Sequence, residues 1–171
     1  MAHTVRRYAK PNKAHIALAK LEKQGKVSAV ITQNVDGLHT KAGSVNVLEL
    51  HGSALRNLCI TCNECYPIDT ILQTDGIPLC ECGGVLKPDV VLYEEGLDSS
   101  VMYKATKAIS DADVLIVGGT SLNVYPAAGL LTHYRGKNLI LINKSETPYD
   151  RHANLIIREN IGQTLGEVTG I

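Results

Sequence analysis

The 171-residue chain predicts an α/β fold in which a parallel β-sheet carries helices on both faces. Short apolar runs that suit buried strands alternate along the chain with segments of helical periodicity. The chain also has seven Tyr but no Phe and no Trp, so its core must be aliphatic, as the cores around parallel sheets usually are. The length fits one domain of this kind with a small additional module.

Composition excludes several classes of protein. The 17 basic and 17 acidic side chains balance, so neither nucleic acid nor an anionic membrane is expected as a partner. No apolar run approaches the roughly 20 residues that a membrane helix needs. The first residues include two arginines but no apolar stretch of the kind found in signal peptides. The cytoplasm is therefore the expected location.

The first predicted element is a helix. Pro11 and Asn12 suit its start, Gly25 suits its end, and the apolar residues between them recur at helical spacing. Strands at 27–32 and 45–50 follow, with a polar loop between them.

The second half of the chain continues the alternation of strands and helices. A helix is expected from Leu97 and Asp98, with Val101, Ala105 and Ile109 on its apolar face. The remaining elements are strands at 113–117, 138–142 and 154–157, a helix from Pro126 to Tyr134, and a closing helix at 161–168.

All five cysteines lie between residues 57 and 88, where the sequence has little periodicity. We therefore expect a small module at 57–88, inserted into a main domain formed by residues 1–56 and 89–171. Cys59-x2-Cys62 and Cys80-x-Cys82 are two close pairs, the arrangement that a tetrahedral zinc site requires. Four thiolates would close the metal to water, so this zinc would be structural.

Two alternatives remain for the cysteines. Cys65 is spaced to replace Cys59 as a ligand. The thiols could instead form a disulfide or stay free and buried, although a cytoplasmic chain argues against a disulfide.

Polar residues follow three of the predicted strands. The carboxyl ends of parallel strands share one edge of a sheet, so these residues should converge on one crevice. Each group alone is typical of a turn, but three together favour a nucleotide-sized ligand. No Gly-x-Gly-x-x-Gly and no phosphate-loop lysine motif is present. The residues concerned are Gln33, Asn34 and Asp36, then Gly119, Thr120 and Ser121, and finally Asn143.

His51 is the preferred candidate for a general base. It ends an apolar strand, precedes Gly52, and belongs to the residue type that titrates near neutral pH. His39 is the competitor, although it could equally cap or orient the loop in which it lies.

The motifs of this chain, in their order, resemble those of one known family. From about residue 9 to the end, they look like the bacterial type of sirtuin (Sir2), the NAD-dependent protein lysine deacetylases and deacylases. The matching motifs are Pro-Asn-x-Ala-His at 11–15, Ile-Thr-Gln-Asn-Val-Asp-Gly-Leu-His at 31–39, Glu-Leu-His-Gly at 49–52, the two cysteine pairs, Leu-Lys-Pro-Asp-Val-Val at 86–91, Gly-Thr-Ser-Leu-x-Val-x-Pro-Ala-Ala at 119–128 and Ile-Asn at 142–143.

The resemblance implies a Rossmann-like domain, NAD as co-substrate and one structural Zn²⁺. It also implies a reaction in which the acyl-lysine oxygen attacks C1′ of the nicotinamide ribose and expels nicotinamide. His51 would then deprotonate a ribose hydroxyl, and the products would be free lysine and O-acyl-ADP-ribose. The implied partners are proteins or peptides that carry acyl-lysine.

The resemblance also implies roles for the polar residues at the strand ends. Asn34 and Asp36 match the ribose and nicotinamide pocket, and Gln33 matches a neighbouring ribose contact. The Gly119, Thr120 and Ser121 segment and Asn143 match the contacts to the phosphates and the adenosine. The edges between which a substrate peptide adds as a strand are matched by Val91, Tyr93, Leu122 and Val124.

The sequence departs from the family pattern at its start. Family members begin with a strand ending in Gly-Ala-Gly-Ile-Ser and a loop carrying Asp-Phe-Arg, and this sequence contains neither. We therefore expect a fold that is incomplete at the N-terminus and a chain that is weakly active or inactive. The alternatives are a catalytically silent module that binds ADP-ribose or an acyl-peptide, and a protein ADP-ribosyltransferase.

The other departures are smaller. Val91-Leu92-Tyr93-Glu94-Glu95 stands where many members carry Phe-Gly-Glu, and Cys-x-Cys replaces the usual Cys-x2-Cys.

Overall fold

The computed structural model describes residues 9–92, 94–123, 125 and 127–171. Tyr93, Val124 and Pro126 lie outside the described residues. The first half of the chain forms α1 (Lys13–Lys23), β1 (Val30–Thr32), α2 (Leu38–Lys41), β2 (Val47–Glu49), β3 (Gly52–Cys59), β4 (Cys65–Pro67), α3 (Ile68–Gln73) and β5 (Leu86–Val90). The second half forms α4 (Ser99–Ser110), β6 (Val114–Gly118), η1 (Ala127–His133), β7 (Asn138–Ile142), η2 (Asp150–His152), β8 (Leu155–Ile157) and α5 (Ile161–Thr169).

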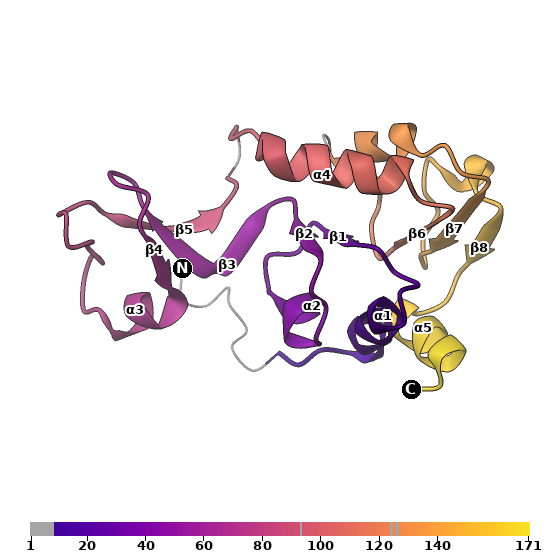
Figure 1. Ribbon diagram of the computed structural model, residues 1–171, viewed down its shortest axis with the longest axis horizontal. Helices are drawn as coiled ribbons and strands as arrows, with labels where there is room; N and C mark the ends of the chain where they lie inside the picture. The colour runs from indigo at the N-terminus through magenta and orange to yellow at the C-terminus, as the bar shows by residue number, and fades with distance from the viewer. Residues whose placement is uncertain (1–8, 93, 124, 126) are drawn as a thin grey trace.

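The strands form two parallel sheets and one antiparallel sheet (Figure 1). β1 pairs with β2, and β6, β7 and β8 pair in that order, all in parallel. β3 lies between β4 and β5 in the antiparallel sheet. The expected parallel architecture is confirmed, but within the described residues no ladder joins the β1–β2 pair to β6.

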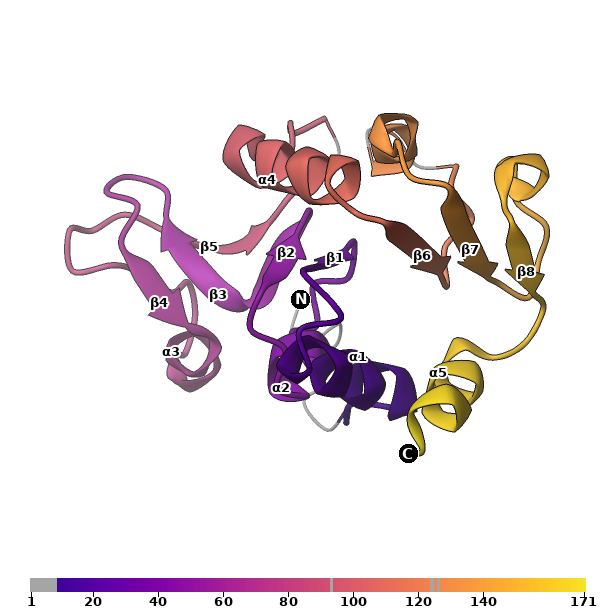
Figure 2. The same ribbon diagram turned by 45° about the vertical axis from the view of Figure 1, so that its right-hand side comes forward.

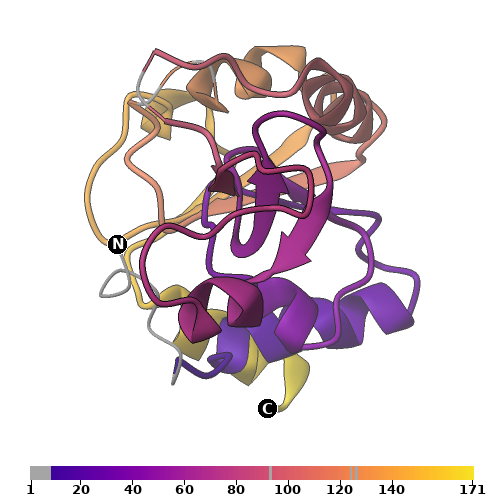
Figure 3. The same cartoon turned by 90° about the vertical axis from the view of Figure 1, so that its left-hand side faces the viewer.

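Helices cover the parallel strands on two sides. α4 and η1 pack together on one side, and α1 packs on α5 on the other (Figure 2). Figure 3, viewed from the side of the antiparallel sheet, shows the strands between these two helical layers. No helix in the described part of the chain is long and apolar enough to cross a membrane.

Each helical layer has its own aliphatic core. On α4, Ala105 and Ile109 are buried against Leu50, at the end of β2, and Leu130 of η1. On the opposite side, residues of α1, α5 and β7 pack together: Ala14, Ala17, Leu165 and Ile142. Burial of aliphatic side chains on both sides therefore holds the helices to the strands.

The ends of the first two long helices are those that the sequence predicts. The Asn12 side chain accepts hydrogen bonds from the backbone amides of Ala14 and His15, which satisfies two free donors at the start of α1. Asp98 accepts from the amide of Val101 at 2.8 Å and begins α4 in the same way. Gly25 follows α1 in the left-handed conformation, with φ of 70°.

The expected helix from Pro126 to Tyr134 is wrong in type. The structure has a 3₁₀ helix, η1, over Ala127–His133. The Thr132 hydroxyl donates to the carbonyl of Gly129 at 2.7 Å, so a side chain three residues on competes for a carbonyl that an α-helix would use.

The first two strands are shorter than expected. β1 begins at Val30 instead of residue 27, and β2 covers only Val47–Glu49. The carboxylate of Glu22 accepts the amides of Val45 and Asn46 at 3.0 and 2.7 Å. Those amides are therefore bound to the end of α1 and do not extend the ladder.

The sequence also missed several elements. The antiparallel sheet of β3, β4 and β5, and the short helices α2, α3 and η2, were not expected. Strand β6 is apolar as expected, yet Val114 and Ile116 remain 46% and 40% exposed, because β6 pairs on one side only within the described residues.

We predict that Gly52→Ala destabilises the fold by roughly 2–4 kcal/mol. Gly52 has a φ of 74°, and a β-carbon there would lie 2.1 Å from the carbonyl oxygen of Asp89 on β5. Thermal unfolding followed by circular dichroism would measure the loss.

Gly25→Ala is the matched control for this prediction. Gly25 has a similar φ of 70°, but nothing lies within 4 Å of its added β-carbon. Gly25→Ala should therefore cost only the strain of a left-handed backbone at a residue with a β-carbon, about 1–2 kcal/mol. Equal losses for the two variants would show that the contact with Asp89 does not matter.

Candidate functional site

The candidate site is centred where β1, β2 and β6 end. The Nδ1 atom of His51 lies 3.1 Å from the backbone oxygen of Gln33, and the Gln33 side chain donates to the hydroxyl of Thr120 at 3.4 Å. Residues that follow three different strands are therefore in contact along one line. This is the convergence at one sheet edge that the sequence predicts.

A pocket of about 350 Å³ continues this line beyond Thr120. Gly119, with φ of 65° and no atom within 4 Å of the place where a β-carbon would stand, leaves the mouth of the pocket open. The Asn143 side chain donates to the carbonyl of Ser145 at 2.9 Å, which shapes the opposite wall. The predicted residues that line this pocket together are Gly119, Thr120, Ser121 and Asn143.

The segment at residues 33–37, here called the polar loop, leads from β1 to α2. Asn34 and Asp36 are exposed on it. One carboxylate oxygen of Asp36 accepts the amide of Leu38 at 3.0 Å and so starts α2. Asp36 therefore serves as a turn former with one oxygen, and its other oxygen has no hydrogen bond to any residue that the structure describes.

His39 lies behind the polar loop and contacts α1. Its ring centroid is 4.5 Å from that of His15. Burial is the main cause that lowers the pKa of each imidazole; His15 lowers the pKa of His39 further, and the charge of Asp36 opposes the shift in both. Two tilted rings, 49° apart, whose charged forms burial disfavours suit a loop support better than a base at the sheet edge.

The predicted peptide edges are described only in part, because Tyr93 and Val124 lie outside the described residues. The Val91 amide donates to the carbonyl of His51 at 3.1 Å, so the end of β5 runs beside the candidate base. The Leu122 side chain is buried against Leu139 and Leu141. The amide of Leu122 donates to the hydroxyl of Thr120 at 3.2 Å. Within the described residues, the carbonyl is therefore the backbone group of Leu122 that could pair with an added strand.

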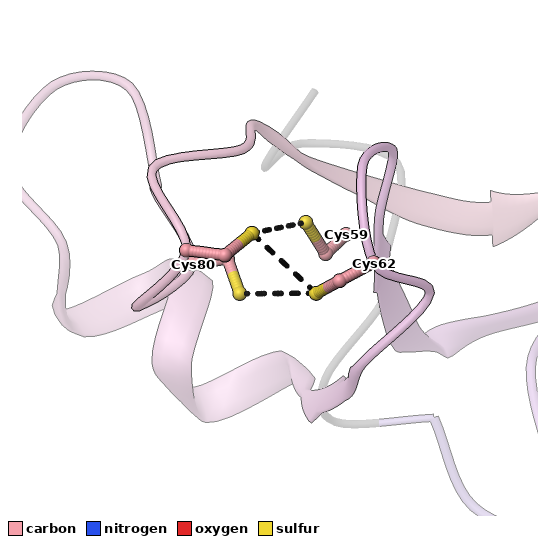
Figure 4. A group of neighbouring side chains, drawn as sticks. Cys59, Cys62 and Cys80 are labelled. Atoms are coloured by element: carbon pink, nitrogen blue, oxygen red, sulfur yellow. Dashed lines mark hydrogen bonds between the residues drawn. The ribbon is translucent and has the colours of Figure 1, made fainter.

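The four predicted zinc ligands gather at the far end of the antiparallel sheet. The sulfur atoms of Cys59, Cys62, Cys80 and Cys82 all lie within 4.8 Å of one another. Figure 4 shows those of Cys59, Cys62 and Cys80 pointing toward one another, from the end of β3 and the turn after it on one side and from the segment of Cys80 on the other. The sulfur of Cys82 lies 3.5 Å from those of Cys59 and Cys62, and the sulfurs of Cys62 and Cys80 are 3.6 Å apart. These separations are close to the roughly 3.8 Å expected between sulfurs around a tetrahedral zinc with Zn–S bonds of about 2.3 Å.

The acidities of the thiols also suit a bound cation. The backbone amide of Cys62 is the main cause that lowers the pKa of Cys59 to about 6. The amide of Glu64 favours a thiolate at Cys62, but the surrounding cysteines outweigh it and raise the pKa of Cys62 to about 12. A divalent cation would allow all four thiolates to coexist, so the residues present fit a structural zinc.

Two neighbours of the cluster have different relations to it. Cys65 is exposed on β4 and is not part of the group of four. The hydroxyl of Tyr66 lies 3.2 Å from the sulfur of Cys80, and this contact is the main cause that raises the pKa of Tyr66 to about 12. Tyr66, which sequence reasoning did not single out, is therefore a hydrogen-bond donor to a ligand sulfur.

Comparison with known proteins agrees with this geometry. The model of the Sir2 family matches residues 1–126. The chain belongs to the Sir2 family. A Clostridium perfringens protein named NAD-dependent protein deacetylase is 61% identical over 162 residues, which cover 94% of this chain and 66% of that protein. A protein of the same name from Sulfolobus acidocaldarius is 49% identical over 166 residues, covering 94% and 65%. The chain thus spans slightly less than two thirds of the length of these curated relatives.

Solved Sir2 structures have the same fold. One described as Sir2 with a p53 peptide and NAD⁺ superposes with a TM-score of 0.86 at 40% identity, covering 95% of this chain and 70% of that one. A complex of a Sir2 homologue with NAD gives a TM-score of 0.88 at 41% identity, with coverages of 95% and 65%.

We predict that Cys80→Ser removes the zinc of this Sir2 chain, whereas Cys65→Ser keeps about one zinc per chain. Cys80 is buried in the cluster, and Cys65 is outside it. Elemental analysis of the purified variants would decide. Loss of zinc from Cys65→Ser would instead assign that thiol as a ligand.

We also predict that Tyr66→Phe speeds zinc release to a chelator by about tenfold, because the thiolate of Cys80 loses a hydrogen bond. Tyr103→Phe is the control, since Tyr103 is 70% exposed on α4. Equal release rates for the two variants would contradict the role of the Tyr66 hydroxyl.

Proposed function

We propose that this Sir2 chain contributes the nicotinamide-ribose pocket, the general base and the zinc module of an NAD-dependent protein lysine deacylase. The contact of His51 with Gln33, continued to Thr120, is the observation that carries the proposal. This contact links the His51 imidazole through Gln33 to Thr120, which lines a pocket together with other polar residues such as Ser121 and Asn143. The names of the relatives and the NAD and peptide complexes of its structural neighbours support the same reaction.

The hydrogen bond to Gln33 selects one tautomer of the neutral His51 ring. A backbone carbonyl only accepts, so the Nδ1 atom of His51 must carry a proton when it donates to Gln33. In the neutral ring, Nε2 is then the nitrogen that can take a proton. We assign it the ribose hydroxyl proton that must leave before the acyl group can pass to the ribose.

The other residues bind and orient the reactants. NAD supplies the ribose carbon that receives the acyl-lysine oxygen as nicotinamide leaves. We assign Asn34, Asp36 and Gln33 to the nicotinamide ribose, and the pocket residues Gly119, Thr120, Ser121 and Asn143 to the phosphates and adenosine. The edges at Val91, Tyr93, Leu122 and Val124 would pair with the backbone of an acyl-lysine peptide.

The remaining assignments belong to the same proposal. Cys59, Cys62, Cys80 and Cys82 would hold one structural Zn²⁺. None of the five cysteines is in a disulfide, and a reducing cytoplasm, the location that we propose, would keep them so. The division into 1–56 with 89–171 and an inserted 57–88 stays a prediction, as does the expectation that neither nucleic acid nor a membrane is a partner.

We predict that His51→Ala lowers deacylation of an acetyl-lysine peptide by at least about 100-fold, the usual contribution of a general base. Mass spectrometry of O-acetyl-ADP-ribose would measure turnover, and calorimetry would measure NAD binding. His133→Ala is the control, because His133 is exposed at the end of η1.

The wild-type chain sets the reference for this prediction. Turnover that survives in His51→Ala would contradict the assignment of the base. NAD binding by the wild-type chain without turnover would favour a silent binding module, and transfer of ADP-ribose to protein would favour the transferase.

A further inference from the structure

Strand β3 contains a bulge close to the candidate base. Ser53 pairs with Asp89 of β5, but the next pair is Asn57 with Pro88. Ala54, Leu55 and Arg56 therefore have no partner on β5, although Asp89 and Pro88 are consecutive; on the other side of β3, Arg56 pairs with Pro67 of β4. Bulges of this kind occur beside active sites, where they redirect a strand. We refer to these three residues as the bulge.

The first part of the bulge contacts the polar loop. The amide of Ala54 donates to the carbonyl of Val35 at 2.8 Å. A β-carbon at Gly37 would lie 2.6 Å from Cδ1 of Leu55, so that side chain closes directly on the loop. Val35 stands between Asn34 and Asp36, so the bulge supports the backbone that presents both of them.

The last residue of the bulge contacts two carboxylates. Arg56 Nη1 lies 2.8 Å from Glu49, and its Nε and Nη2 atoms lie 3.0 and 2.9 Å from one oxygen of Asp89. The Arg56 side chain is 46% exposed, but that of Glu49 is only 13% exposed. Only a planar guanidinium has donors directed at both carboxylates at once.

Both carboxylates belong to segments that meet at His51. Glu49 ends β2 two residues before His51, and Asp89 is two residues before Val91, whose amide donates to the His51 carbonyl. Gly52, the next residue, allows the Asp89 carbonyl to approach. Arg56 therefore bridges the two segments that fix the His51 backbone, while its neighbours in the bulge contact the polar loop.

We propose that Arg56 is a positioning residue: by holding the bulge between Glu49 and Asp89, it fixes the polar loop relative to His51. The positioning itself stands on the contacts above. Its consequence for catalysis rests on the proposed function. Arg56 is itself 46% exposed, and ion pairs of a half-exposed side chain are each worth little, so the effect is expected in local order more than in global stability.

Amide hydrogen exchange on the full chain, loaded with zinc, tests the positioning directly. In Arg56→Gln, the amides of Ala54 and Val91 should exchange about tenfold faster. The amide of Cys59, which donates to Glu64 at 2.9 Å on the same strand, should change by less than about twofold. Arg56→Lys keeps the positive charge but lacks the two-pronged guanidinium, so its exchange rates should lie between those of the wild type and Arg56→Gln.

Lys107→Gln is the matched control. It removes an exposed ion pair with Asp111 on α4, at 2.7 Å, that touches none of these segments. All three amides should exchange as in the wild type. Equal acceleration of Cys59 with Ala54 and Val91 in Arg56→Gln would indicate a general loss of stability and overturn the proposal. Unchanged exchange at Ala54 and Val91 would overturn it as well.

A kinetic measurement then tests the consequence. Arg56→Gln should lower kcat for deacylation by about tenfold and leave KM for NAD within about twofold, because alignment and not binding is lost. A raised KM with unchanged kcat would overturn this consequence. Absence of turnover in the wild-type chain would favour the silent binding module, and the exchange experiment would still decide the role of Arg56.

Discussion

The parallel pairing of β1 with β2 is the constraint on which the candidate site depends. Its register puts Thr32 opposite Glu49, and the amide of Leu50 donates to Thr32 at 2.9 Å. Because both strands run in the same direction, Gln33 and His51 emerge beside each other at one edge. The contact of His51 is with a backbone carbonyl, so strand pairing itself sets where the imidazole lies and which of its nitrogens is free. A slip of one residue would turn these side chains to the other face.

The sequence predicts this edge well because each component has a local signature. Asn12 and Asp98 cap helices by accepting hydrogen bonds from amides two or three residues further along the chain. Strand β7 covers Asn138–Ile142 as expected because its apolar run is continuous. The late start of β1 and β2 has no such signature. It depends on the Glu22 carboxylate, which lies more than 20 residues before the amides of Val45 and Asn46 that it accepts. Local patterns cannot report a contact of that separation.

The zinc module shows the same division between what is local and what is not. The spacing of the cysteines is sufficient to predict that four thiols gather, and the structure brings together the expected four. The strands next to them were missed, since the bulge breaks the alternation of β3 and Pro88 lies within β5. Tyr66 was missed for another reason: its role depends on a hydroxyl reaching Cys80, 14 residues away.

Strand β3 links these two parts of the molecule, because it begins at Gly52 beside His51 and ends at Cys59 in the metal cluster. The ladder with β5 holds it at both ends, but not across the bulge. A displacement at the cysteines can reach His51 through β3 only by way of the bulge. The bulge is held by the Val35 carbonyl, by the pairing of Arg56 with Pro67 of β4 and by the two ion pairs of Arg56. The stiffness of those few contacts therefore determines how far the metal cluster, which stabilises one end of the strand, also orders the site at the other.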